Sequence, residues 1–400
     1  MSDVVIIGGG YAGVHATHAA IQAGGHVTLI EPTGRHGLVT RGAAIAGGRS
    51  PLTDADLDLQ ELFDPSAVEV VASPAVGLDH AARTVATADG RRWPGESVVI
   101  TSGAVPAPPP VEGAADHAWQ LGSIADAIAV RARLATAGSV VVVGGGATGV
   151  QLAAEVASAY PDRQVTVVEA GPRLLPDEPS PLGHSASRIL RAAGVHVRTT
   201  TPVLSITARG VRLANAVHLD GVVLWAGGWQ PTGAALLPTA PVTDGRLQVD
   251  TDLQVLGHPG IFAAGDVAHH LDVARRPLPM SAQIAVQAGA AAGRNAVTWG
   301  RSGYTRHPRL IELGRVVQMG ADRGVARMGP LRLGTRPTDR LVPLLHLTID
   351  LRHLWRLGGL GAVQHHAPGR VDRTSGRPAP IRERTASPVR QPDPIGPRHG

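Results

Sequence analysis

Cysteine is absent from this 400-residue chain, and its absence removes several kinds of chemistry at once. Without thiols there are no disulfide cross-links, no thiolate metal ligands and no cysteine-based redox catalysis. Lysine is also absent, so arginine supplies all 37 basic residues, while aromatic residues make up only 3% of the chain. The core must therefore be built mainly from alanine, valine, leucine and isoleucine.

Long apolar runs are missing too. No run reaches the roughly 18 residues that a membrane-spanning helix needs, and the first residues lack the pattern of a secretory signal. We therefore expect a cytoplasmic location. The net charge is only +5, and part of it lies near the C-terminal end. We interpret this as an ordinary arginine-rich surface and expect no nucleic-acid partner.

The first 31 residues show the pattern of a strand, a glycine turn, a helix and a second strand. In the turn, Gly8 permits a tight bend, Gly10 lets a pyrophosphate approach the backbone, and Gly13 lets helix and strand pack closely. The helix N-terminus offers N–H groups to the phosphates, and Glu31 at the end of the second strand suits ribose hydroxyls. This combination predicts a dinucleotide site.

A second turn repeats the same logic with Gly144, Gly146 and Gly149, and its second strand ends on Glu169. An acidic residue at that position favours a free ribose 2′-hydroxyl and repels a 2′-phosphate, which predicts NADH in preference to NADPH. Arg173 lies just beyond and would offer a partner to a 2′-phosphate, but we interpret it as a solvated loop residue.

The fold class that these patterns predict is α/β, with two Rossmann-like dinucleotide-binding domains, one inserted into the other, and a small C-terminal segment. Alternating strands are expected in two meanders, within 68–102 and 195–224, and the proline-rich stretch 105–113 is expected to be a linker. The predicted parts are 1–110 and 236–300 for the first domain, 111–235 for the inserted domain, 301–365 for the C-terminal segment and 366–400 for a disordered tail.

Three more motifs accompany the two glycine turns: Thr101-Ser102-Gly103, Trp225-Ala226-Gly227, and the stretch from Thr251 that ends in Gly265-Asp266. Over about residues 1–300, the chain resembles the flavoprotein disulfide reductase superfamily, whose members bind two dinucleotides. The resemblance implies FAD at the first turn, a nicotinamide cofactor at the second, and Asp266 bonded to the FAD ribityl chain. The further cofactor-binding residues that it assigns are Thr101, Gly103, Gly227 and Gly265.

Within that superfamily, the missing cysteines remove the disulfide reductases and the sulfide:quinone oxidoreductases. Residues 282–289 read A-Q-I-A-V-Q-A-G, similar to the motif that type II NADH:quinone oxidoreductases carry where a helix faces the flavin. The resemblance implies hydride transfer from NADH to FAD and then reduction of a quinone. It assigns Ala282 to the flavin, and Gln283 and Gln287 to an acceptor pocket. A polar stripe facing solvent is the alternative for the two glutamines.

Two departures weaken the quinone interpretation. That family commonly has a glutamate where this chain has Gln151, although Glu155 follows one turn later, and lysines that some members carry are absent here. Two alternatives therefore stay open: a soluble NAD(P)H-dependent reductase of an iron–sulfur protein, and a flavin-dinucleotide redox sensor. His269 and His270 are interpreted as surface or packing residues, and no metal site is expected.

The C-terminal segment contains one amphipathic candidate helix, from Pro343 to Leu357. Leu344, Leu347, Leu351 and Leu354 recur at helical spacing, with arginines and Trp355 between and beside them. Such a helix suits the cytoplasmic face of a membrane, packing on its own domain, or a homodimer contact.

Overall fold

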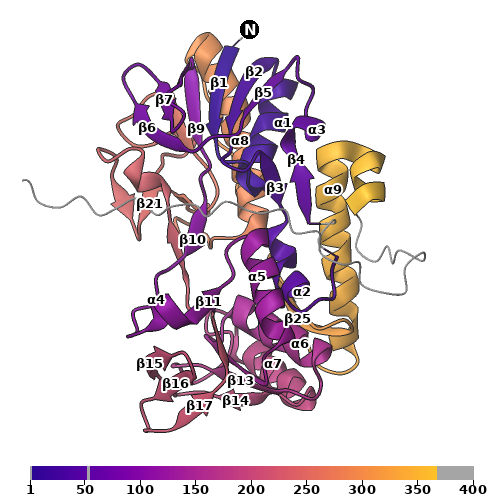
Figure 1. The fold of residues 1–400 in the computed structure, drawn as a ribbon. Coiled ribbons are helices and arrows are strands. Elements are labelled where there is room, and N and C mark those ends of the chain that lie inside the picture. The colour runs from indigo at the N-terminus through magenta and orange to yellow at the C-terminus, as the bar shows by residue number, and fades with distance from the viewer. Residues whose placement is uncertain (1, 52–54, 367–400) are drawn as a thin grey trace, which may run out of the picture. The chain divides into compact units, whose positions relative to one another are not determined.

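The computed structural model describes residues 2–51 and 55–366 (Figure 1). The tail expected to be disordered therefore lies outside the described residues, apart from His366. The expected α/β class is confirmed: two parallel five-stranded sheets form the framework, and helices pack on them.

The first sheet has the strand order β22-β9-β1-β2-β5, with every neighbouring pair parallel. Its central strand is a buried run of β-branched residues, as a parallel strand covered on both faces requires. Its strands are β1 (Ser2–Ile7), β2 (Gly25–Ile30), β5 (Val68–Val71), β9 (Ser97–Ile100) and β22 (Ile261–Ala263).

The second sheet repeats this plan with the order β11-β18-β12-β13-β14, again all parallel. All its strands fall between β9 and β22 along the chain, so one parallel sheet is inserted into the sequence of the other. Its strands are β11 (Ala118–Gln120), β12 (Ser139–Val143), β13 (Gln164–Val168), β14 (His196–Arg198) and β18 (Val222–Trp225).

Short antiparallel sheets accompany the two main ones, including both expected meanders. The three-stranded sheets are β6 (Ala75–Asp79), β7 (Thr84–Thr87) and β8 (Arg92–Pro94); β15 (Val203–Thr207), β16 (Gly210–Leu213) and β17 (His218–Asp220); β24 (Gly314–Met319), β25 (Arg323–Met328) and β26 (Leu331–Leu333); and the mixed sheet of β20 (Val242–Thr243), β21 (Arg246–Gln248) and β23 (Ala268–His269).

The two passages of the chain between the main sheets are paired with each other. Strand β10 (Ala104–Pro106) lies antiparallel to β19 (Trp229–Pro231), and Val105 faces Gln230 in the register. The stretch 105–113, expected to be a linker, does run between the two main sheets, and its first two residues belong to β10. A second two-stranded ribbon joins β3 (Arg35–Gly37) to β4 (Asp56–Asp58).

The helices run between and beside these strands. The main ones are α1 (Tyr11–Gln22), α2 (Gly42–Ala46), α5 (Ile124–Ala135), α6 (Ala147–Ala159), α7 (Ser180–Ala192), α8 (Ala282–Ser302) and α9 (Val342–His366), with short turns of helix at α3 (Leu59–Leu62) and α4 (Ala114–His117).

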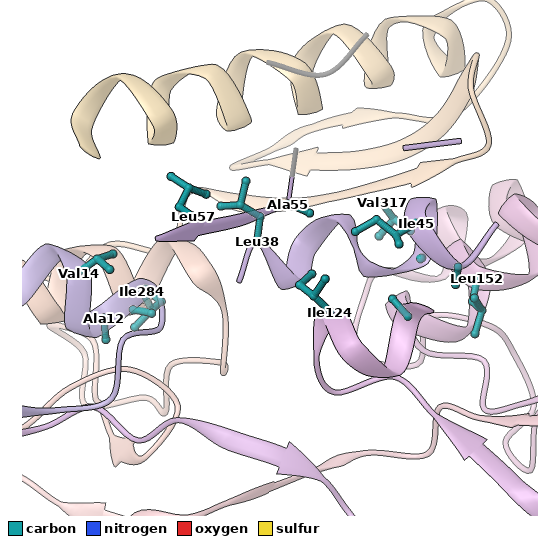
Figure 2. Close-up of a cluster of buried hydrophobic side chains, with 14 of the residues drawn as sticks. Ala12, Val14, Leu38, Ile45, Ala55, Leu57, Ile124, Leu152, Ile284 and Val317 are labelled. Carbon is teal, nitrogen blue, oxygen red and sulfur yellow. The ribbon is translucent and has the colours of Figure 1, made fainter. Parts of the chain in front are cut away.

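The largest hydrophobic cluster is continuous from α1 and α8 to α2, α5, α6 and β24 (Figure 2). At one end Ala12 and Ile284 pack together, and at the other Leu152 and Val317 approach Ile45. The cluster thus ties the first glycine helix to the second glycine helix. Small side chains dominate it, as the shortage of aromatic residues requires.

Helices α1 and α8 cross very closely, because glycine faces the α1 backbone at two positions. A Cβ atom added at Gly289 would collide with the carbonyl oxygen of Ala12, and one added at Gly293 would collide with that of Ala16. The last glycine of the motif at 282–289 therefore has a packing role. It lets α8 lie directly against the helix that begins at the first glycine turn.

The expected C-terminal helix is present as α9, and it is longer than predicted, with non-helical backbone at Gly358 and Gly359. At about 100° per residue, Leu344, Leu351 and Trp355 fall on one side, and Leu344 and Trp355 are 62% and 56% exposed. The side that is buried against the rest of the protein carries Leu354 and Leu357 together with histidine and aspartate residues. Within the described residues, no helix combines the length and apolarity needed to cross a bilayer.

Candidate functional site

The first glycine turn has the geometry that a bound pyrophosphate requires. Gly8 has a φ of +105°, and a Cβ there would lie 2.5 Å from the carbonyl oxygen of Thr101. A Cβ on Gly13 would collide with the carbonyl of Gly8. At Gly10, by contrast, no described atom lies within 4 Å of an added Cβ. Space is therefore left open beside the N-terminus of α1, where Gly10 is the N-cap.

The second turn reproduces each of these features. Gly144 has a φ of +110°, and its Cβ would lie 2.6 Å from the carbonyl oxygen of Ala226. A Cβ on Gly149 would collide with the Gly144 carbonyl, whereas one on Gly146 meets no described atom within 4 Å. Open space again adjoins the N-terminus of a helix, here α6. The two turns are built on the same plan, as the sequence predicts.

Both acidic residues lie over their turns. An Oε2 atom of Glu31 accepts a hydrogen bond of 2.7 Å from the Gly9 N–H, and Glu169 accepts one of 2.6 Å from Gly145. The other oxygen of Glu169 accepts 2.6 Å from the Gly171 N–H. Each carboxylate is thus held at the edge of its open space, in the place that suits a ribose.

Arg173 is bound to its own loop. Its guanidinium donates to the carbonyl oxygens of Leu175 at 2.8 Å and Glu178 at 2.7 Å, and also to that of Pro176. Arg173 is thus a loop residue, as interpreted, but it is half-buried and not fully solvated. Three of its N–H groups donate to the backbone, and Glu169 is the charged side chain at the ribose position.

Two motifs at strand ends contact the glycine turns: Thr101-Ser102-Gly103 at the first and Trp225-Ala226-Gly227 at the second. The Thr101 hydroxyl lies 2.8 Å from the Ile7 carbonyl and 3.0 Å from that of Gly8, so it braces the turn. Gly103 takes a left-handed conformation, with φ +71°. In the second motif, a Cβ on Gly227 would lie 2.6 Å from the Trp225 ring, so the glycine leaves room for the indole.

Asp266 lies at the end of β22, next to the start of α8. Burial raises the pKa of its carboxyl to about 6, although Arg246 and a hydrogen bond from the Ser281 N–H oppose the shift. Gly265 takes a φ of +82°, and its N–H donates 3.2 Å to Nε2 of His270. His270 is therefore the packing residue that the sequence suggests, and burial lowers the pKa of its ring to about 3.

A cavity of about 750 Å³ begins at the second turn and runs toward the segment before α8. Glu169 and Gly146 lie at its start, Trp225 and Gly227 along one side, and Met280 at its far end. A neighbouring cavity of about 510 Å³ also reaches Met280 and continues past Arg246. The cavity at the second turn therefore reaches Met280, two residues before α8 begins, and the neighbouring cavity reaches Arg246, which interacts electrostatically with Asp266.

A charged cluster lines the smaller of the two cavities, and no pattern in the sequence predicts it. Glu178, only 5% exposed, binds Arg315 at 2.9 Å and Arg327 at 2.7 Å, and Arg327 also binds Glu312 at 2.8 Å. These pairs join the loop after β13 to the β24–β25 hairpin. No short sequence motif predicts these ion pairs, because Glu178 is far from its arginine partners in the sequence.

Gln283 and Gln287 lie side by side on α8, but against the C-terminal segment. The Gln283 amide accepts from the Leu313 N–H at 2.9 Å and donates to the Gly314 carbonyl at 2.5 Å. Gln287 exchanges two hydrogen bonds with the backbone of Ile311, at 3.0 and 2.9 Å. The alternative of a solvent-facing stripe is therefore wrong. Neither side chain lines the two cavities described above.

Glu155, one turn beyond Gln151, does not provide a free carboxylate. It is 1% exposed and paired with Arg49, whose Nε and Nη2 donate to its two oxygens at 2.9 and 2.6 Å. The pair links α6 to the segment after α2. Glu155 is therefore not a free substitute for the glutamate that the sequence lacks at Gln151.

Three hydrogen-bonded histidines adjoin the first turn, and no pattern in the sequence predicts them. Nδ1 of His36 is 2.9 Å from the Gly9 carbonyl, Nε2 of His36 is 3.1 Å from Nε2 of His353, and Nδ1 of His353 is 3.2 Å from Nε2 of His15. The three residues come from β3, α9 and α1. Among the described residues, no three side chains are arranged to hold a metal ion.

A family model described as pyridine nucleotide-disulphide oxidoreductase matches residues 2–289, well over half of the chain. The chain belongs to this family. As a family member it is an oxidoreductase that uses a pyridine nucleotide. The two glycine turns, which share the same geometry, suit that chemistry. The disulphide part of the family description has no counterpart, since this member has no cysteine.

Curated and solved relatives agree with this assignment. The chain is 25% identical over 398 residues to a type II NADH:quinone oxidoreductase of Staphylococcus aureus, and the similarity covers 90% of this chain and 96% of the relative. The NDH2 of Plasmodium falciparum, solved in complex with NADH, has a TM-score of 0.76 at 16% identity, with 91% and 96% covered. A ferredoxin reductase from Rhodopseudomonas palustris has a TM-score of 0.73 at 21% identity, with 82% of each chain covered.

Proposed function

We propose that the protein is an NADH dehydrogenase that binds FAD at the first glycine turn and NADH at the second, and delivers electrons to a quinone. The observation that carries this proposal is the cavity that runs from the second turn to Met280, two residues before the start of α8. A nicotinamide dinucleotide bound at Glu169 and extended along this cavity would end near the N-terminus of α8.

The residues at the first turn fit FAD on three counts. Gly10 leaves open space beside a helix N-terminus, which is a ready site for a diphosphate. Asp266 is half-buried next to the start of α8, the helix that packs against α1. The hydroxyl oxygens of Ser102 and Ser281 are buried without a hydrogen-bond partner among the described residues, so they can bind a polar ligand.

When bound, FAD supplies the hydride acceptance and onward electron transfer that protein side chains cannot perform. The chain's own residues bind and orient. Gly10 and the α1 N-terminus hold the diphosphate, Glu31 the adenosine ribose, and Asp266 the ribityl hydroxyls. The N-terminus of α8 carries a partial positive charge, which would stabilise the negative charge of a reduced flavin bound beside Ala282.

NADH is proposed in preference to NADPH because of the charge at the second ribose position. Glu169 would repel a 2′-phosphate, and Arg173 is already bonded to three carbonyl oxygens of its loop. Trp225 and Gly227 shape the cavity beyond, where the nicotinamide would lie.

The quinone is proposed from the motif at 282–289 and from the type II NADH:quinone oxidoreductase relative, whose similarity covers 90% of this chain. Gln283 and Gln287 then act through the backbone that they hold at 311–314, as positioning residues for the acceptor side. The exposed apolar side of α9, with Leu344, Leu351 and Trp355, suits a membrane surface on which a quinone would be met.

The test is a steady-state assay of the purified protein with bound flavin. We expect NADH oxidation to be fast with a short-chain quinone, and slower when NADPH replaces NADH. Fast oxidation with ferricyanide but none with quinone would contradict the acceptor. If a ferredoxin-type iron–sulfur protein were then reduced instead, the protein would be a soluble reductase. If every acceptor gave slow turnover with tight NADH binding, it would be a sensor.

A further inference from the structure

The Gly9 carbonyl fixes the proton positions in the whole histidine chain. A carbonyl oxygen can only accept, so Nδ1 of His36 must carry a proton and donate to it. A neutral His36 then has a bare Nε2, and Nε2 of His353 must donate to it. Nδ1 of His353 is bare in turn and accepts from Nε2 of His15. Three hydrogen bonds therefore point in one direction, toward Gly9.

Burial keeps all three rings neutral, as this arrangement requires. His36 is fully buried and His15 is 6% exposed. Burial lowers the pKa of His36 to about 4, that of His15 to about 3 and that of His353 to about 2. A second proton on His36 or His353 would place two N–H groups face to face and break the chain.

The end of the chain lies on the back of the peptide group that faces the proposed diphosphate. The Gly9 carbonyl and the Gly10 N–H belong to one trans peptide, so they point in opposite directions. His36 binds the carbonyl, while the N–H side adjoins the open space at Gly10. A donor on the carbonyl both orients this peptide and polarises its N–H, and hydrogen bonds in series strengthen one another.

The other end of the chain lies on the C-terminal helix. His353 is a residue of α9, and the Tyr11 ring stacks on it with centroids 4.5 Å apart. On the same side of α9, Asp350 binds Arg41 at 3.0 Å, and both residues are buried. The position of α9 thus decides whether His353 can donate to His36.

We propose that the chain His15–His353–His36 positions the diphosphate-binding turn, and that it makes FAD affinity depend on the docking of α9. This inference rests on the proposed FAD site. His36 acts on the cofactor through the Gly9–Gly10 peptide, and His353 acts through His36.

The first experiment measures the binding of FAD to deflavinated full-length protein by flavin fluorescence. In His36→Leu the Gly9 carbonyl loses its donor, and we expect FAD to bind about 10-fold to 100-fold more weakly. In His36→Asn the amide nitrogen replaces Nδ1, so affinity should be largely restored. His353→Leu should weaken FAD by about 3-fold to 10-fold through lost orientation of His36, and His353→Gln should rescue it.

His18 provides the matched control. It lies one turn beyond His15 on α1 and also contacts α9, through the Leu357 backbone, but it has no link to Gly9. His18→Leu should leave FAD affinity within about 2-fold of the wild-type value, because the histidine chain stays intact. NADH binding at the second turn and the thermal unfolding midpoint report whether each variant is folded.

The second experiment observes the tautomers directly. In the ¹⁵N spectrum of the wild-type holoprotein, His36 should be protonated at Nδ1, and His353 and His15 at Nε2. In His353→Leu the His36 signal should become a mixture of tautomers. A different tautomer pattern, wild-type FAD affinity in both leucine variants, or an equal loss in His18→Leu would overturn the inference. A wild-type protein that binds no FAD would instead refute the proposed function.

Discussion

At the scale of single residues, Glu31 and Glu169 occupy equivalent places but belong to different sites. Each ends the second strand of its unit and accepts a hydrogen bond from the middle residue of its own turn. The sequence predicts both of them from spacing alone, since the glycine pattern and the strand length determine where the strand ends. Only the structure shows that Arg173, four residues after Glu169, is bonded to its own loop.

Replacing Glu169 with glutamine should relax the preference for NADH. The carboxylate's repulsion of a 2′-phosphate is lost while the hydrogen bonds to the turn are kept in part. We expect the ratio of kcat/KM for NADPH to that for NADH to rise by about 10-fold, the size of one charged contact. Steady-state kinetics with both cofactors measure it. Glu31→Gln is the control, because it should alter FAD retention and leave this ratio unchanged.

The buried histidines make stability depend on pH. His15, His36, His270 and His353 have pKa values of about 2 to 4 in the folded protein, against 6.5 when unfolded. Below about pH 6.5 the unfolded chain binds protons that the folded protein does not, so stability is complete above that pH and falls as the pH decreases toward 4. Each histidine contributes up to about 1.4 kcal/mol per pH unit.

Asp266 acts in the opposite direction, because its raised pKa lets the folded protein hold a proton between pH 3.8 and about 6. The net decrease should therefore correspond to at least three protons: four histidines less one carboxyl, with His18 and His346 adding to it because burial lowers their pKa values as well. Urea unfolding at a series of pH values measures the slope, and His36→Asn should make it shallower. A free energy of unfolding that stays constant from pH 7 to 5 would refute the neutral histidine chain.

At the scale of elements, the crossing of α1 and α8 connects the first turn to the motif at 282–289. The sequence presents Gly289 as part of a functional motif, whereas the structure shows it in contact with the α1 backbone. Replacing Gly293 with alanine should destabilise the protein by about 1–3 kcal/mol, because its Cβ has no room beside Ala16. Gly138→Ala is the matched control, since no described atom lies within 4 Å of its Cβ. Urea unfolding compares the two variants, and equal stabilities would contradict the close crossing.

Helix α9 was predicted from leucine spacing, but of the four leucines only Leu354 is fully buried. Leu344 is exposed, while His353 and Asp350 face the protein and bind His36 and Arg41. Hydrophobic periodicity misses a buried side that consists of polar groups paired with distant residues. The hydrogen bonds between the three histidines and the ion pairs of Glu178 cannot be predicted from the sequence for the same reason.

The outward side of α9 should bind lipid. Trp355→Ser should reduce co-sedimentation with anionic vesicles by about 10-fold, because a tryptophan of this exposure loses its burial in the interface. Trp119→Ser is the control, since Trp119 is also exposed, at 38%, but lies on β11. If both variants sediment like the wild-type protein, α9 is not the lipid-binding element, and a concentration-dependent dimer should then be sought by sedimentation velocity.

At the scale of the whole molecule, one parallel sheet is inserted between β9 and β22 of the other, and the two crossing passages pair as β10 and β19. The two glycine turns predict two dinucleotide-binding units, whereas the insertion of one into the other is expected from the resemblance to the flavoprotein superfamily. The sequence does not predict how the two units meet. They share the continuous hydrophobic cluster that runs from α1 and α8 to α5 and α6.

The proposed electron path runs from a nicotinamide dinucleotide at the second turn to a flavin at the first. In an anaerobic titration of the purified holoprotein with NADH, followed by visible absorbance, we expect stoichiometric NADH to bleach the flavin spectrum and a short-chain quinone to restore it. NADPH should bleach the spectrum more slowly. A protein purified without flavin that takes up none, or a bound flavin that NADH leaves oxidised, would refute this path.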